Sequence, residues 1–116
     1  IMIRLGIIGY GYWGPNIVRN FMAHPDCQVV AVCDKNPAAL ARVSSRHPGV
    51  RTVIDADEII GSSEIDAVAI ITPVSSHYPL AKKTLENGKH VFIEKPFTAT
   101  SAQAEELIEI AEVVLD

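Results

Sequence analysis

Basic clusters and long apolar segments are both missing from this sequence of 116 residues. Its 10 Lys and Arg stand against 14 Asp and Glu, a net charge of -4, so we expect no nucleic-acid or anionic-membrane surface. The longest stretch without a charged residue, 67–81, contains two prolines and two serines and is too short to span a bilayer. The amino terminus lacks a basic region followed by an apolar run, so we expect no signal peptide. We therefore expect a soluble globular unit.

Cysteine is scarce as well, with Cys27 and Cys33 as the two thiols. Both lie in one extended segment, and at about 3.3 Å per residue they are roughly 20 Å apart, beyond the reach of a disulfide. Two free thiols favour a reducing compartment, the cytoplasm. Cys, His, Asp and Glu nowhere have metal-ligand spacing, so we predict no metal site.

The length allows one domain, and 48% apolar residues are enough to build its core. Short apolar runs typical of strands alternate with helical patterns, the last helical pattern following the last strand over 100–115. The predicted strands are 3–8, 28–33, 51–54, 66–71 and 90–93. This alternation predicts a doubly wound α/β fold of the Rossmann type, a parallel sheet in the order 3-2-1-4-5. Ligands bind such sheets at the carboxyl ends of the strands.

Several helix ends are readable. Asn36 before Pro37 is expected to cap the second helix. Asp55 with Glu58 resembles a capping box that opens a short third helix. Ser75 or Ser76 is expected to cap the fourth helix, and Gly88 to end it.

The turn after the first strand has the pattern G-x-G-x-x-G, formed by Gly9, Gly11 and Gly14. The first glycine permits a tight turn, the second lets the backbone approach a pyrophosphate, and the third allows close packing of helix and strand. Pro15 and Asn16 follow, which excludes a P-loop, and the helical pattern excludes a kinase glycine loop. The alternative is a glycine-rich turn that binds no ligand.

Asp34 ends the second strand, where a carboxylate can accept hydrogen bonds from the ribose hydroxyls of an adenosine. It would repel a 2'-phosphate and so favours NAD over NADP, although the adjacent Lys35 weakens that exclusion. A helix-capping role is the alternative, but Asn36 is expected to fill it. The turn and the acid together fit dinucleotide binding better than an S-adenosylmethionine site.

The last predicted strand ends in Glu94-Lys95-Pro96. On a plain reading, this is a charged strand end stopped by proline. At the carboxyl edge of the sheet, however, Lys95 would lie near the nicotinamide half of a bound coenzyme. A lysine there can orient hydroxyl groups or move protons.

With these motifs in view, the sequence resembles the amino-terminal domain of the Gfo/Idh/MocA oxidoreductases over nearly its whole length. The elements that carry the resemblance are Gly9-x-Gly11-x-x-Gly14, Thr72-Pro73 with His77, Gly88-Lys89-His90-Val91 and Glu94-Lys95-Pro96-Phe97. The resemblance implies that Lys95 contacts the nicotinamide ribose or a substrate hydroxyl and assists catalysis, and the tripeptide Glu94, Lys95 and Pro96 belongs to the coenzyme site.

The resemblance also assigns cofactor contacts beyond the glycines. Thr72, Pro73 and His77 are expected to line the cofactor groove, although a capping or packing role for His77 is an open alternative. Tyr12 and Trp13 belong to the phosphate turn, and Trp13 can reach the nicotinamide side. The stretch 11–16, followed by 19–21, is similar to a branch of the family that oxidises nucleotide-linked amino sugars at C3.

The function implied is hydride transfer between NAD, or less readily NADP, and a hydroxyl of a sugar, nucleotide sugar or cyclitol. Family members carry a second domain that supplies the substrate pocket, a further acid-base residue and an oligomer interface. That domain is absent from residues 1–116, so we expect this chain alone to be inactive and the complete protein to be a homo-oligomer. The alternative function is a module or sensor that binds NAD(H) without chemistry.

Overall fold

The computed structural model describes residues 2–11, 14–93 and 102. The site residues predicted at positions 12, 13 and 94–96, and most of the helix predicted over 100–115, lie outside these residues. The elements are β1 (Ile3–Ile8), α1 (Gly14–Ala23), β2 (Cys27–Cys33), α2 (Pro37–Arg46), β3 (Arg51–Val53), α3 (Asp57–Ile60), β4 (Ala67–Ile70), the 3-10 helix η1 (Val74–Ser76), α4 (His77–Glu86) and β5 (His90–Ile93).

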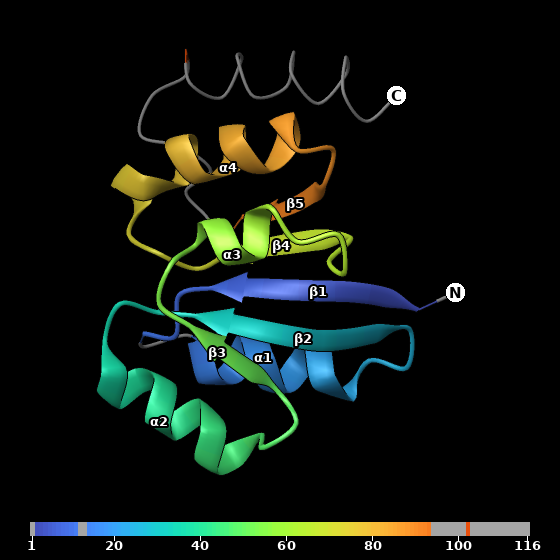
Figure 1. Cartoon of the computed structure of the whole chain (residues 1–116), viewed down its shortest axis with the longest axis vertical. Helices are drawn as coiled ribbons and strands as arrows, with labels where there is room; N and C mark the ends of the chain where they lie inside the picture. The colour runs from blue at the N-terminus through green and yellow to red at the C-terminus, as the bar shows by residue number, and fades with distance from the viewer. Residues whose placement is uncertain (1, 12–13, 94–101, 103–116) are drawn as a thin grey trace.

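These strands form one parallel sheet in the order β3-β2-β1-β4-β5, which confirms the predicted fold (Figure 1). The chain moves from β1 outward to β3, then crosses to β4 and continues to β5. The strand order therefore reverses at the boundary between β1 and β4. In an open parallel sheet, this switch point is where the loops diverge and leave a crevice.

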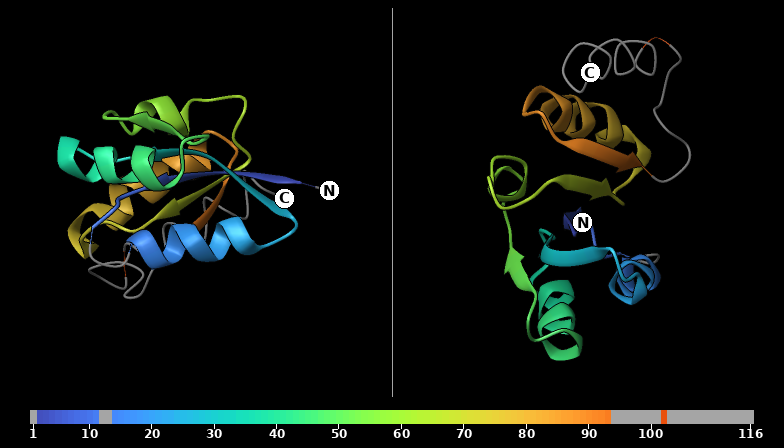
Figure 2. Two further views of the ribbon diagram at one scale, coloured as in Figure 1. Left: turned by 90° about the horizontal axis from the view of Figure 1, so that it is seen from below. Right: turned by 90° about the vertical axis from the view of Figure 1, so that its right-hand side faces the viewer.

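Helices cover both faces of the sheet, and Figure 2 shows α1 and α3 on opposite sides. One core cluster contains Val18 of α1 and Val43 of α2, both fully buried. The other contains Ile59 of α3 and Leu85 of α4. Because both faces are covered, the central strands are apolar without alternation, as in β4 with its sequence Ala-Val-Ala-Ile. None of the helices in the described ranges has the length and apolar character needed to cross a membrane.

Helix ends agree with the sequence in part. The Asn36 side chain accepts a hydrogen bond from the Ala38 N–H, so the predicted cap is confirmed. Asp55 accepts from the Asp57 N–H, two residues on, instead of forming the predicted capping box with Glu58. The prediction that Ser75 or Ser76 caps α4 is wrong, because α4 has no side-chain cap and the Ser76 hydroxyl is bonded elsewhere. Gly88 follows α4 with a φ of +74°, as a terminating glycine should.

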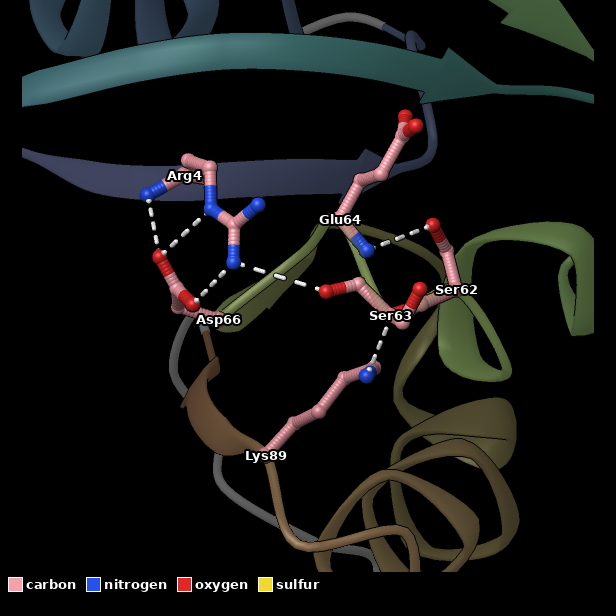
Figure 3. A network of polar contacts seen from close by, with 6 residues as sticks. All are labelled: Arg4, Ser62, Ser63, Glu64, Asp66 and Lys89. Carbon is pink, nitrogen blue, oxygen red and sulfur yellow. Dashed lines mark hydrogen bonds and ion pairs between the residues drawn. The ribbon is translucent and has the colours of Figure 1, made fainter.

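A polar network ties the strands together at the amino edge of the sheet (Figure 3). Arg4 of β1 donates to both carboxylate oxygens of Asp66 through Nε and Nη2, and its backbone N–H donates to Asp66 as well. These hydrogen bonds hold the pKa of Asp66 below its ordinary value. Lys89, only 8% exposed, donates from Nζ to the Ser62 carbonyl at 2.7 Å. We call Arg4, Asp66, Ser62 and Lys89 the amino-edge network.

Candidate functional site

The glycine turn begins where β1 ends. Gly9 has a φ of +106° and donates its N–H to the Cys33 carbonyl at 2.8 Å. A Cβ at Gly9 would lie 2.6 Å from the backbone oxygen of Ile71, so both the torsion and the space require glycine. A Cβ at Gly11 would meet no atom of the described residues within 4 Å, so this part of the turn is open among them. A Cβ at Gly14 would lie 3.2 Å from the Tyr10 ring, because α1 starts against that side chain.

Asp34 lies one residue beyond β2 and links this turn to α2. Its Oδ2 accepts from the Tyr10 N–H and its Oδ1 from the Asn36 N–H, both at 2.8 Å. Each carboxylate oxygen has a second lone pair, so the half-buried Asp34 can still accept two hydroxyl donors. The carboxylate thus fixes the glycine turn and remains able to bind a ligand. The sequence indicated the second role but gave no signal for the first.

On the other side of the switch point, the chain from Thr72 to His77 forms a lip. His77 is 2% exposed, and its Nε2 donates to the Thr72 carbonyl at 2.8 Å. The Ser76 hydroxyl lies 2.6 Å from Thr72 Oγ1 and 2.7 Å from the Pro73 carbonyl oxygen. His77 therefore holds the lip from within the protein, and its direct contact with a cofactor stays a prediction.

Between the glycine turn and the lip lies a cleft of about 550 Å³, within the range of small-molecule sites. Its polar lining includes Asp34, Lys35, Thr72, Ser75 and Ser76, and Gly9, Gly11 and Pro73 also border it. Its apolar lining is formed by Ile8, Cys33, Ile54, Ala56, Ile71, Pro79 and Leu80. The structure thus brings together at one cleft predicted residues of three separate loops, whereas the predicted Gly14 and His77 lie outside the lining.

The apolar wall was not predicted from the sequence. Ile54 follows β3 and is 60% exposed, which is unusual for so large an apolar side chain. The predicted sheet order put β3 next to β2, so the end of β3 could have been named as part of the crevice. Leu80 lies one turn into α4 and has no comparable signal in the sequence.

Cys33 forms part of the cleft floor and is a free, buried thiol. Its Sγ lies 3.4 Å from the Ile54 carbonyl oxygen, to which it donates. Burial and the nearby Asp34 carboxylate raise the pKa of Cys33 to about 11. Because the thiol stays protonated at neutral pH, it serves as a small apolar surface and not as a nucleophile.

The cleft therefore combines an open glycine turn at a helix start, a carboxylate with spare lone pairs and an apolar wall. The open turn suits a diphosphate, the carboxylate suits sugar hydroxyls, and the apolar wall suits a planar base. These residues fit a nicotinamide dinucleotide. Among the residues the structure describes, no three His, Cys, Asp or Glu side chains gather as they would around a metal ion.

Comparisons with known proteins agree with this geometry. The model of the Gfo/Idh/MocA family, an oxidoreductase family with an NAD-binding Rossmann fold, matches residues 3–114. A dTDP-3,4-didehydro-2,6-dideoxy-alpha-D-glucose 3-reductase from Streptomyces antibioticus is 36% identical over 115 residues, which cover 94% of this chain and 33% of the reductase.

Two solved structures superpose closely. An NAD-binding protein from Listeria innocua has a TM-score of 0.92 at 32% identity, covering 98% of this chain and 33% of that one. KijD10, a 3-ketoreductase from Actinomadura kijaniata in complex with NADP and TDP-benzene, has a TM-score of 0.90 at 28% identity, covering 97% and 35%. The chain spans about a quarter to a third of the length of the curated relatives it matches.

Proposed function

The chain belongs to the Gfo/Idh/MocA oxidoreductase family with its NAD-binding Rossmann fold, and we propose that it is the coenzyme-binding part of a dehydrogenase or reductase acting on sugars. The observation that carries the proposal is the cleft between the glycine turn and the lip, with Asp34 at one end. A second domain of the complete protein, in this proposal, contributes the substrate pocket and a further acid-base residue.

Residues around the cleft would divide the coenzyme among them. The open backbone at Gly11 and the start of α1 would hold the diphosphate, since helix N-termini favour anions. Asp34 would accept from the adenosine ribose hydroxyls with its spare lone pairs. Ile54, just after β3, and Leu80 of α4 would pack against the adenine. Thr72 then lies toward the nicotinamide half.

When bound, the coenzyme supplies or accepts a hydride at the nicotinamide ring. In the sequence, Lys95 comes two residues after the end of β5, the strand that lies next to β4. We assign its ammonium group to orient the substrate hydroxyl and to assist removal of the hydroxyl proton. Because such transfers depend on short distances and alignment, holding the hydroxyl in place is the larger part of this role.

We propose NAD as the preferred coenzyme. A 2'-phosphate would approach the Asp34 carboxylate, and the two charges repel each other. Lys35 also lines the cleft and reduces this repulsion without removing it. NADP therefore remains a weaker ligand.

As substrate we propose a nucleotide-linked sugar that reacts at C3. Support comes from the reductase of Streptomyces antibioticus and from the similarity of residues 11–16 to the branch that acts on such sugars. We also propose a homo-oligomer, because Met22 and Phe92 are large apolar side chains that are 44% and 47% exposed. The two free thiols fit the reducing conditions of the cytoplasm.

Calorimetric titration of this chain with NAD, NADP and S-adenosylmethionine tests the coenzyme assignment. We expect saturable binding of NAD, weaker binding of NADP and no binding of S-adenosylmethionine; binding of the last compound alone would refute the assignment. Asp34→Ala should weaken NAD more than NADP. Asp34→Asn, which keeps one acceptor for a backbone N–H, is the control for disturbance of the turn, and equal losses for both coenzymes would show that the ribose contact is misassigned.

Turnover separates the enzyme from a module that binds NAD(H) without chemistry. In the complete protein, Lys95→Ala should lower kcat by at least about tenfold while coenzyme affinity stays nearly constant. Unchanged turnover would remove Lys95 from the mechanism. A complete protein that binds NAD but oxidises or reduces no sugar or nucleotide sugar would favour the sensor.

A further inference from the structure

The lip contains a pair of hydroxyl groups whose protons can be assigned. Ser76 Oγ lies 2.6 Å from Thr72 Oγ1 and 2.7 Å from the Pro73 carbonyl oxygen. Both distances are typical of hydrogen bonds between oxygens. Thr72, Pro73 and Ser76 all line the cleft, so the direction of these bonds decides what the lip offers to a ligand.

Ser76 has one hydroxyl proton for these two contacts. The Pro73 carbonyl can only accept, so the 2.7 Å contact is favourable only when the Ser76 proton points at it. The 2.6 Å contact then becomes a hydrogen bond when Thr72 donates its own proton to Ser76. The opposite assignment would leave Ser76 Oγ facing the carbonyl oxygen with no proton between them. One arrangement therefore satisfies both contacts, and in it the Thr72 proton is used in the hydrogen bond to Ser76.

The surrounding backbone keeps this arrangement in place. The Ser76 N–H donates to the same Pro73 carbonyl at 2.9 Å, which fixes the turn of η1. His77 Nε2 donates to the Thr72 carbonyl at 2.8 Å from inside the protein. The carbonyl groups of Thr72 and Pro73 are thus both held by hydrogen bonds from the residues at the start of α4.

We propose that Ser76 is a positioning residue that makes the Thr72 hydroxyl a hydrogen-bond acceptor for a donor group on the nicotinamide riboside half of the coenzyme. The inference rests on the proposed function. Because its proton is used in the hydrogen bond to Ser76, Thr72 Oγ1 can only accept from a ligand in the cleft, so it binds O–H or N–H groups and disfavours groups that only accept. The ribose hydroxyls and the carboxamide NH2 are the donors in that half of the coenzyme.

This assignment gives the cleft a defined sequence of polar groups from the β2 side to the β4 side. Asp34 on the β2 side is an acceptor, and Thr72 on the β4 side is a second acceptor. The glycine turn and the start of α1 between them favour anionic groups. A molecule with hydroxyl or amide groups in both halves and phosphates in the middle matches this order.

Binding of NAD, ADP-ribose and ADP to the wild-type chain and to Ser76→Ala tests the proposal. We expect Ser76→Ala to weaken NAD about fivefold, the loss of one neutral hydrogen bond, with ADP affinity unchanged. An equal loss for ADP-ribose would identify the ribose hydroxyl as the donor, and a loss for NAD alone would identify the carboxamide. A loss that includes ADP to the same extent would overturn the proposal, because it would reflect a general disturbance of the cleft.

Two further variants complete the experiment. Ser45→Ala removes an exposed hydroxyl of α2 that does not line the cleft, and it should leave the ratio of NAD to ADP affinity within twofold of wild type. Thr72→Val should reproduce the loss of Ser76→Ala, and the double variant should lose no more than either single variant. Because the ratio is measured within each variant, a partial loss of folded protein does not change it.

Additive losses in the double variant would overturn the proposal, because Ser76 would then act without Thr72. Wild-type binding of NAD with no change in Ser76→Ala would overturn this inference alone. A wild-type chain that binds neither NAD nor ADP would overturn the proposed function, and with it the inference.

Discussion

The two edges of the sheet are built differently. At the amino edge, charged side chains bond to one another and to backbone, as Arg4 does with Asp66 and Lys89 with Ser62. At the carboxyl edge, the backbone makes the shape, through the positive φ of Gly9 and the open position of Gly11, and Asp34 keeps lone pairs in reserve.

The difference separates what stabilises the fold from what binds. Side chains that satisfy each other have little left for a ligand, whereas a turn shaped by glycine presents backbone groups that no helix or strand has used. Changes at the amino edge should therefore lower stability without lowering affinity. Changes at the carboxyl edge should lower affinity, with a separate and variable effect on stability.

Gly9→Ala should have the largest effect, because it affects both properties. A Cβ 2.6 Å from the Ile71 oxygen, at a φ of +106°, should lower the free energy of unfolding by about 3 kcal/mol. Gly11→Ala is the control: stability should change by less than about 0.5 kcal/mol, while NAD affinity falls about tenfold because the added Cβ obstructs the diphosphate. Urea unfolding measures the free energy of unfolding, and calorimetry measures NAD affinity. An equal loss of stability in Gly9→Ala and Gly11→Ala would contradict the difference expected between these two positions.

Alkaline pH should lower the free energy of unfolding, because Cys33 in the cleft floor loses its proton. The pKa of Cys33 is raised from 9.0 to about 11, so the folded state keeps the thiol proton over a range in which the unfolded chain has lost it. Stability from this group is complete below pH 9 and is lost as pH rises through 11, by about 2 kcal/mol. Comparing urea unfolding of the wild type and Cys33→Val from pH 8 to 11 isolates the contribution of the Cys33 thiol to the free energy of unfolding. A constant difference between the two proteins would rule the effect out.

Lys89→Met should lower stability by about 1.5 kcal/mol, because it leaves the Ser62 carbonyl without its lysine donor. NAD affinity should stay within twofold. Lys83→Met is the matched control: the Lys83–Asp57 ion pair is more than half exposed, so its loss should leave stability nearly unchanged. A fivefold loss of NAD affinity in Lys89→Met would contradict the claim that the amino edge affects stability alone.

Tyr10→Phe should have the smallest effect and the opposite sign. The Tyr10 hydroxyl is buried without a hydrogen-bond partner among the described residues, so removing it should raise stability by about 1 kcal/mol. Affinity should not change, since the backbone N–H at position 10 still donates to Asp34. Thermal unfolding measures the shift, and destabilisation would show that the hydroxyl has a partner such as a bound water.

The sequence predicted the sheet well because strands buried on both faces are continuous apolar runs. β1 and β5 have the predicted bounds, and β2 begins one residue earlier than predicted. The free thiols are also confirmed, since the extended β2 keeps Cys27 and Cys33 apart. Patterns of this kind depend on neighbours along the chain, which a sequence displays directly.

The details of the site depended on contacts between distant residues. Asp34 was predicted at the end of β2, but its bond to Tyr10 joins residues 24 positions apart. Ser76 was expected as a helix cap, a local role, and the structure instead bonds it to Thr72 and Pro73. Where a short polar side chain has two possible partners, folding of the loop decides between them, and composition gives no preference.

The bonds of Asp34 have a consequence for redesign. A single substitution of Asp34 meant to switch the coenzyme would also release the Tyr10 amide and loosen the glycine turn, to which we assign the diphosphate. Coenzyme preference and the conformation of the glycine turn thus both depend on Asp34. A redesign would need another hydrogen-bond acceptor for the Tyr10 amide before the charge at position 34 is changed.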